Sequence, residues 1–158
     1  RRHPGSSAEA GRRHIRKAPV PTWFTGRFER QLDNKNRVAL PAEFRRHFGE
    51  SCVLALGSTG CIEVFTQERF DEMAQKLLDK LDAEEVDADE VRVFSSSIRQ
   101  PTFDGQGRIV LDQSFREYAG IADGDRLVVN GRLDRLEIWE SSAFEPIEAR
   151  GTQARKNR

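Results

Sequence analysis

Apolar and polar positions recur in the same order twice along the chain, and this order predicts two related halves. Each half has an apolar triplet that predicts a short buried strand, then one or two helical turns, then two strands joined by a tight turn. In the first half these segments are Val38–Leu40, Pro41–Gly49, Cys52–Leu56 and Cys61–Phe65. In the second half they are Ile109–Leu111, Asp112–Gly120, Leu127–Asn130 and Leu136–Glu140. With a further short strand before each triplet, a half reads as strand, turn, strand, short helix and hairpin.

The strongest helix signal lies between the two halves. Thr66 is a suitable N-cap, and apolar residues follow it at helical spacing, at positions 70, 73, 74, 77, 78 and 81. We expect this stripe to pack on the body of the protein or on a neighbouring subunit. Val86, Val91 and Phe94 predict a second helix that leads into the second half. Residues 145–158 show no periodicity, so we expect a flexible tail there.

A five-residue frame, Asp-x-x-x-Arg, precedes the apolar triplet in each half. It is Asp33–Arg37 in the first half and Asp104–Arg108 in the second. Seven residues after each Arg comes a phenylalanine, Phe44 and Phe115. Agreement at so many positions indicates an internal duplication.

The residues inside the frame suit a reversal of the chain, because Asn36 and Gly107 can adopt positive φ. The Asp side chain can accept hydrogen bonds from backbone N–H groups of the turn. A planar guanidinium can also bind a phosphate or a base edge with two hydrogen bonds. Two interpretations stay open: a structural Asp–Arg pair that fixes the turn, or an arginine that contacts DNA.

A half of about 45 residues has too few strands to bury its own core. Two halves that intercalate around a pseudo-twofold axis could close a small barrel, which removes exposed strand edges. We therefore expect a mainly β protein with short helices (α+β), a pseudo-twofold barrel built from two internal repeats, with helices between the halves. The expected segments are a disordered basic extension at 1–22, repeats at 27–69 and 98–141, connecting helices at 70–97 and a flexible basic tail at 145–158.

The composition is that of a highly charged protein. Of its 158 residues, 37% are hydrophobic and 33% are charged, and no apolar run approaches the roughly 18 residues of a membrane helix. Cys52 and Cys61 lie in apolar, strand-like segments and are too few for a disulfide scaffold or a structural zinc site. We expect both thiols to be buried and reduced, and the protein to be cytoplasmic.

The net charge of zero hides a partition along the chain. Residues 1–21 carry a net charge of +5 and residues 148–158 carry +3, whereas residues 22–147 carry −8. Basic ends on an acidic body are typical of proteins that meet a polyanion, and they are also typical of solubilising tails. The run 79–90 holds seven acids opposed only by Lys80, which indicates a solvated linker or helix face.

Beyond these patterns, the sequence resembles the MraZ family. Phe24–Phe28 followed by Leu32–Pro41 is similar to the opening of that family, and Asp104–Ile109 is similar to its second signature. Asn36 stands where the family usually has Gly. Trp23 stands where the family commonly begins with Met, so the residues before it are an extension outside the resemblance.

The resemblance implies two SpoVT/AbrB-like swapped-hairpin halves in one chain. It also implies a bacterial transcriptional regulator, expected to act as a repressor, that binds repeated short sites upstream of its own division and cell-wall operon. Members of the family form closed rings of several subunits and associate with the nucleoid. The implied partners are double-stranded promoter DNA and further copies of the chain, with no membrane and no small-molecule substrate.

The resemblance places the DNA-contacting elements on the two frames. The residues expected to contact DNA are Lys35, Arg37, Gln106 and Arg108. The residues expected to hold the turns are Asp33, Asn36, Asp104 and Gly107. We expect no catalytic residue, no metal ligand and no cofactor.

Two other classes of function are alternatives. An enzyme with one Asp from each half would resemble an aspartic protease, but Asn34 and Gly105 follow the Asp where such sites use a small hydroxyl residue. His3, His14 and His47 form no triad or metal-ligand pattern. The other alternative is an AbrB-like antitoxin or protein-interaction module, although antitoxins usually carry one barrel half per chain and this chain carries both.

Overall fold

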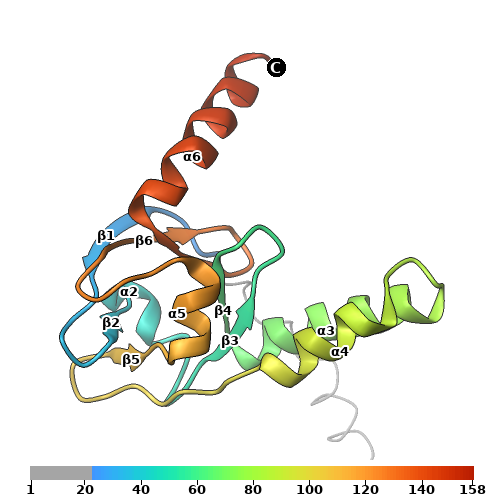
Figure 1. Ribbon diagram of the computed structural model, residues 1–158, viewed down its shortest axis with the longest axis horizontal. Helices are drawn as coiled ribbons and strands as arrows, with labels where there is room; N and C mark the ends of the chain where they lie inside the picture. The colour runs from blue at the N-terminus through green and yellow to red at the C-terminus, as the bar shows by residue number, and fades with distance from the viewer. Residues whose placement is uncertain (1–22) are drawn as a thin grey trace, which may run out of the picture.

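A computed structural model describes residues 23–158 and shows an antiparallel β body from which two helical arms extend (Figure 1). The strands are β1 (Arg27–Gln31), β2 (Arg37–Ala39), β3 (Val53–Leu56), β4 (Ile62–Phe65), β5 (Arg108–Val110), β6 (Arg126–Gly131) and β7 (Leu136–Glu140). The helices are α2 (Ala42–Arg45), α3 (Gln67–Asp82), α4 (Ala88–Ser97), α5 (Gln113–Ala119) and α6 (Ser141–Lys156). The predicted basic extension at 1–22 lies outside the described residues. Among the helices of residues 23–158, none is both long and apolar enough to span a membrane.

The strands form two separate antiparallel sheets, so the α+β class is confirmed but the closed barrel is not formed among residues 23–158. The larger sheet has the order β1-β6-β7-β4-β3, and β2 pairs with β5 in a two-stranded ribbon. The ribbon covers the core by side-chain packing, because Val38 and Ile109 at its centre are fully buried. Residues 51–54 meet residues 99–102 through two isolated bridges, Ser51–Thr102 and Leu54–Arg99, which are too few to continue the sheet around the body.

The two halves interlock, because each contributes strands that pair with strands of the other. β1 pairs with β6, β4 with β7, and β2 with β5. The ribbon places Val38 directly opposite Ile109, its equivalent in the other half. The Leu54–Arg99 bridge is the symmetry equivalent of the pairing between β1 and β6. In the bridge, Arg99 lies in the segment of the second half that corresponds to β1, and Leu54 lies in the segment of the first half that corresponds to β6. The chain therefore has the pseudo-twofold relation that the duplication predicts.

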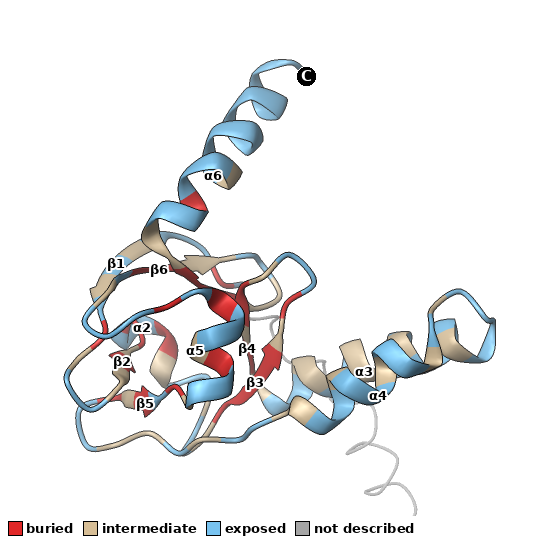
Figure 2. Cartoon of the chain, in the orientation of Figure 1, coloured by how far each residue is buried: buried red, intermediate tan, exposed pale blue. Residues whose placement is uncertain are grey.

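One hydrophobic core joins the two halves. Equivalent residues are buried together in it, namely Val38 with Ile109, Leu40 with Leu111, and Phe44 with Phe115. Burial is concentrated in the strands and in α2 and α5, whereas the two arms are mostly exposed (Figure 2). Cys52 and Cys61 are both free and buried, as predicted.

Helix ends lie where the local sequence predicts them. The Thr66 side chain accepts the Arg69 N–H at 3.2 Å and caps α3. The Asp112 carboxylate accepts the Phe115 N–H at 3.0 Å and caps α5, which ends at Gly120 with φ of 68°. The second helix of the connecting segment is also confirmed as α4.

The C-terminal segment differs from the expected flexible tail over 145–158, because α6 continues to Lys156. Glu140 caps this helix by accepting the N–H groups of Ser142 and Ala143 at 2.9 Å and 3.1 Å. Phe144 then anchors the first turns against Trp139, with ring centroids 5.7 Å apart. The sequence did not predict this helix because helices were predicted from the spacing of apolar residues. The outer half of α6 has no apolar stripe and so gives no such spacing.

Helices α3 and α4 form the other arm, an antiparallel hairpin that extends from the body (Figure 1). Its root packs on a small buried cluster of Val53, Ala55 and Phe65. No residue of α3 or α4 is itself buried. Leu78 and Val93 are 48% and 62% exposed, so the hairpin presents apolar side chains that its own chain does not cover.

Candidate nucleic-acid interface

The first Asp-x-x-x-Arg loop joins β1 to β2 and is held by the Asp33 carboxylate. Its Oδ1 accepts the Lys35 N–H at 2.9 Å and the Arg37 N–H at 2.8 Å. Its Oδ2 accepts the Arg37 Nε–H at 2.8 Å. Asn36 takes the left-handed conformation with φ of 60°, which closes the turn. One carboxylate thus satisfies two backbone donors and orients the arginine.

The second loop repeats this geometry. Asp104 Oδ1 accepts the Gln106 N–H and the Arg108 N–H, each at 2.9 Å. Its Oδ2 accepts the Arg108 Nε–H at 2.8 Å. Gly107 takes φ of 74° at the position that Asn36 occupies in the first loop. The duplication in sequence is therefore a duplication of the loop's hydrogen bonds.

The two loops lie side by side because the β2–β5 ribbon joins them. The Leu111 N–H donates to Asn36 O at 2.9 Å, and the Leu40 N–H donates to Gly107 O at 3.3 Å. Each loop is thereby bonded to the strand that follows the other loop. Figure 1 shows β2 and β5 together at one end of the body.

The charged residues of the two frames also pair across the ribbon. Arg37 Nη1 lies 3.6 Å from Asp104 Oδ2, and Arg108 Nη1 lies 3.7 Å from Asp33 Oδ2. Together with the bonds inside each loop, these contacts close an ion-pair quartet of Asp33, Arg37, Asp104 and Arg108. The quartet is electrically neutral, and its cross contacts are longer than hydrogen bonds, so they act through charge.

Both carboxylates of the quartet titrate below the ordinary range. The backbone hydrogen bond from Arg108 is the main cause that lowers the pKa of Asp104 to about 2, and the Arg108 guanidinium and the Gln106 N–H add to it. Partial burial works to raise the pKa of Asp33, but hydrogen bonds from Arg37 and Lys35 outweigh it and leave that pKa lowered. Both carboxylates of the quartet are therefore ionised at neutral pH.

The exposed parts of the loops are their tips. Lys35 and Gln106 occupy equivalent tip positions, and both are exposed. The side chains of Arg37 and Arg108 are 23% and 26% exposed, and their ion pairs use Nε and Nη1. The structure thus brings all four residues expected to contact DNA onto two adjacent loops.

Arg45 is a residue of this region that sequence reasoning missed. It lies against Gly107, so that a Cβ added to the glycine would overlap its guanidinium. Its Nε is buried and has no hydrogen-bond partner. The repeat offered a signal, because Arg45 and Arg116 each directly follow the paired phenylalanines. In the second half the Arg116 Nε–H donates to Leu111 O at 2.9 Å.

An open depression of about 640 Å³ lies beside the first loop. Amide and carboxylate side chains line it, among them Gln31, Asn34, Asn36 and Asp123. Amide and carboxylate groups can form hydrogen bonds with the edges of nucleobases. The depression gives the first loop a polar and concave surface beside it.

One group of metal-ligand type occurs within residues 23–158, away from the loops. The ligand atoms of Cys61, Glu63 and Glu137 lie within 4.8 Å of one another. Glu63 accepts from Arg135 at 2.9 Å and Glu137 accepts from the Trp139 indole at 3.0 Å. Burial raises the pKa of the Cys61 thiol, so this group is a neutral thiol beside two carboxylates that already have partners.

Comparison with known proteins identifies relatives over most of the described region. A profile of the MraZ protein family, described as antitoxin-like, matches residues 23–94 and again residues 96–157. A protein of Kocuria rhizophila named transcriptional regulator MraZ is 37% identical over 123 residues, which are 77% of this chain and 84% of the relative. Proteins of the same name from Leifsonia xyli subsp. xyli and Lactiplantibacillus plantarum are 35% identical over 134 residues and 36% identical over 126 residues. These matches cover 85% and 79% of this chain, and 92% and 87% of the relatives.

Proposed function

This chain belongs to the MraZ family, and we propose that it is a transcriptional regulator that binds duplex DNA through its two Asp-x-x-x-Arg loops. The observation that carries the proposal is the pair of identically built loops side by side on the β2–β5 ribbon. Each loop has a rigid hydrogen-bonded frame and an exposed polar tip. The relatives bear the name of a transcriptional regulator, which agrees with this assignment.

The frame and the tip have different tasks in this proposal. Asp33 and Asp104 fix the turns, so that the tips need no ordering when DNA binds. Lys35 and Gln106 make the outermost contacts, and Lys35 meets a phosphate. In Arg37 and Arg108, Nε and Nη1 form the ion pairs of the quartet. The remaining N–H groups of each guanidinium donate to the DNA.

The assembly in the proposal is a ring of several copies, and the α3–α4 hairpin supports it. Its apolar stripe of Met73, Leu77, Leu78 and Leu81 contains no buried residue. Leu78 of this stripe and Val93 of α4 are 48% and 62% exposed, and exposed apolar side chains of this kind are typical of a surface that another copy covers. The glutamate substitutions Leu78→Glu and Val93→Glu should therefore reduce the native mass measured by light scattering without unfolding the β body.

A ring would convert weak contacts into useful affinity. Each protomer offers few cations at its loops, so its binding to one site should be weak and sensitive to salt. Several identical loop pairs on repeated short boxes bind together, and the later contacts are effectively intramolecular. We place these boxes upstream of the protein's own division and cell-wall operon, where the protein acts as a repressor and associates with the nucleoid.

The test is a titration of the full chain against the DNA upstream of its own gene, with one, two or more boxes. Affinity should rise steeply with the number of boxes, and equal affinity for one and several boxes would contradict the avidity argument. Lys35→Gln should weaken binding and lower the slope of log affinity against log salt by about 0.9. Lys76→Gln, which removes an exposed lysine from α3, is the matched control and should leave binding to a single box unchanged.

Arg37→Ala separates the two roles of the motif. If Arg37 contacts DNA, the variant loses binding and keeps its native mass and its folded β body. A variant that unfolds or dissociates would instead favour a purely structural role for the quartet. Co-purification with a stoichiometric small protein, together with no DNA binding, would favour the antitoxin-like alternative.

A further inference from the structure

The outer half of α6 is a helix with nothing beneath it. Its first turns are anchored, because Phe144 is buried and Ile147 packs on the same small cluster with Trp139 and Val128. From Glu148 onward every residue is exposed. The helix leaves the body at the side away from β2 and β5 and projects outward (Figure 1).

This outer half is strongly basic. Residues 149–158 contain Arg150, Arg155, Lys156 and Arg158 and no acidic side chain. At about 100° per residue, Arg150 and Arg155 lie about 140° apart around the helix, and Arg158 follows just beyond its last residue, Lys156. The acids of α6 lie nearer its root, where Glu148 is paired with Arg27 at 2.9 Å.

Stabilisation of the helix end does not account for all of these charges. Cations stabilise the last turn of a helix through its dipole, which accounts for Arg155 and Lys156. Arg150 lies in the middle of the helix, where that effect has faded. Gly151 follows it, and a glycine weakens a helix that has no tertiary support. The outer half of α6 therefore exposes its cations to solvent on a weakly supported helix, which binding to another surface would stabilise.

Comparison with α3, the equivalent helix of the first half, indicates what kind of surface this is. Both helices follow the last strand of their half, and Phe70 and Phe144 occupy matching anchor positions. On α3 the apolar stripe continues through Leu77 and Leu81, and Leu77 lines one groove together with Val91 and Phe94 of α4. On α6 the matching positions hold Gly151 and Arg155, so its outer half has no stripe to insert into an apolar groove.

We propose that residues 149–158 bind the phosphate backbone of duplex DNA as a second contact that does not depend on sequence. This inference rests on the proposed DNA binding by the loops. Duplex DNA presents one negative charge per about 1.7 Å, and each neutralised phosphate releases condensed counterions. Because α6 is about 24 Å long and lies away from the loops, it would contact phosphates outside the base pairs that the loops read.

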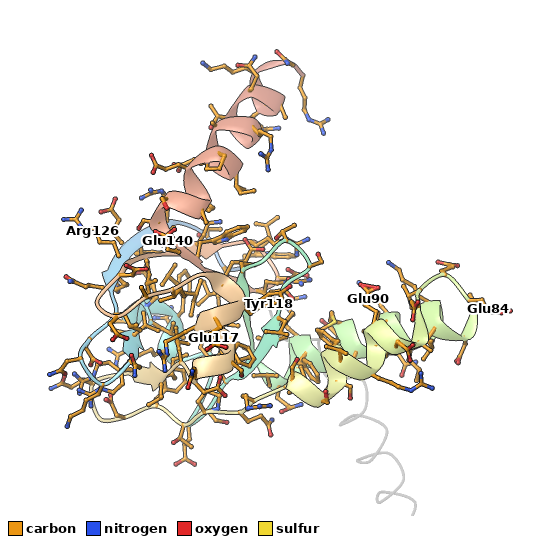
Figure 3. The ribbon with its side chains drawn as sticks, in the orientation of Figure 1. Glu84, Glu90, Glu117, Tyr118, Arg126 and Glu140 are labelled. Carbon is orange, nitrogen blue, oxygen red and sulfur yellow. The ribbon has the colours of Figure 1, made fainter. Side chains whose placement is uncertain are left out.

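The competing occupant is the acidic tip of the α3–α4 hairpin in a second copy. That tip carries the seven acids of residues 79–90, and Glu84 and Glu90 stand out along it in Figure 3. Ion pairs between exposed side chains are weak and are screened by salt. With no apolar stripe on α6 to support such a pairing, the denser charge of DNA is the better match.

The test uses the full chain with all four cations replaced, in the variant R150Q/R155Q/K156Q/R158Q. Binding is measured across a range of salt concentrations with a duplex that contains the boxes and with a duplex of unrelated sequence. The slope of log affinity against log salt should fall by about 3 to 4, because about 0.9 is lost per phosphate contact. The preference for boxes over unrelated sequence should stay the same. The matched control R150K/R155K/R158K keeps the charges and should keep the slope.

Hydrogen exchange gives an independent readout. The amides of residues 149–156 should exchange quickly in the free protein and several-fold more slowly with DNA. An unchanged salt slope in the glutamine variant, beside wild-type binding and a normal effect of Lys35→Gln, would overturn this inference alone. A lower native mass with an unchanged slope would likewise overturn it and assign α6 to a second copy. Failure of the wild-type chain to bind any duplex would refute the proposed function and this inference together.

Discussion

Gly107 is the point at which the second loop should be most sensitive to substitution. Its φ of 74° costs a residue with a side chain about 1–2 kcal/mol. A methyl group there would also overlap the Arg45 guanidinium, and displacing that packed side chain should add about 1 kcal/mol. Gly107→Ala should therefore lower the free energy of unfolding by about 2–3 kcal/mol. For a chain of this size, the melting temperature should fall by about 4–12 °C.

Two further variants divide this cost into its parts. In an Arg45→Ala background the overlap is absent, so Gly107→Ala should cost only the conformational part, about 1–2 kcal/mol. Asn36→Ala changes the equivalent left-handed position of the first loop, where a Cβ is already accommodated, and should cost no more than about 1 kcal/mol.

Urea unfolding at one fixed protomer concentration measures all five proteins, namely the wild type, Gly107→Ala, Arg45→Ala, Arg45→Ala/Gly107→Ala and Asn36→Ala. The concentration is fixed because association would otherwise contribute to the apparent stability. If Gly107→Ala costs no more than Asn36→Ala, or costs the same with and without Arg45, the reasoning is refuted.

Three other outcomes follow from the structure. Because their folded-state pKa values are lowered, Asp33 and Asp104 add stability above the ordinary Asp pKa of 3.8 that is lost as the pH falls through the folded values. Carboxyl NMR titration should place the Asp104 midpoint near 2, and a midpoint at the ordinary value would contradict the hydrogen-bonded quartet. Tyr118→Phe removes the hydroxyl that donates to Gly57 O and should lower the free energy of unfolding in urea by about 1 kcal/mol. An unchanged free energy of unfolding would show that this hydrogen bond does not stabilise the protein. Burial raises the pKa of Cys52 to about 12 and also raises that of Cys61, so a thiol reagent should label neither cysteine until the protein unfolds.

Features with a local cause could be predicted from the sequence. The caps at Thr66 and Asp112, the end of α5 at Gly120 and the left-handed Asn36 each depend on a few neighbouring residues. The duplication was equally visible, because equivalent apolar positions in a pseudo-symmetric core need similar side chains. The apolar stripe of α3 predicted its helix, since a face that must be covered leaves a period in the sequence.

Features that depend on contacts between the halves could not be predicted in the same way. Which strand edges pair is decided by the packing of the whole body, so the ribbon and the open five-stranded sheet were mistaken for one closed barrel. The position of Arg45 over Gly107 joins residues far apart in sequence, and the repeat marks Arg45 as the equivalent of Arg116 without showing this contact. Helix α6 was missed because only its root is packed, and an unpacked helix needs no periodicity.

The charges of the candidate site indicate how affinity and sequence preference would be divided between parts of the protein. The quartet is neutral, so its two arginines add no net charge to the loops, and Gln106 adds none either. Lys35 is then the one cation at the two tips without a partner in the quartet, and residues 22–147 as a whole carry a net charge of −8. A loop pair can therefore supply hydrogen bonds to bases but little long-range attraction to DNA. Attraction would have to come from the number of loop pairs in a ring and from the basic end of α6. If so, removing the charges of α6 should weaken binding to every duplex alike, whereas changes at the loop tips should alter which duplex is preferred.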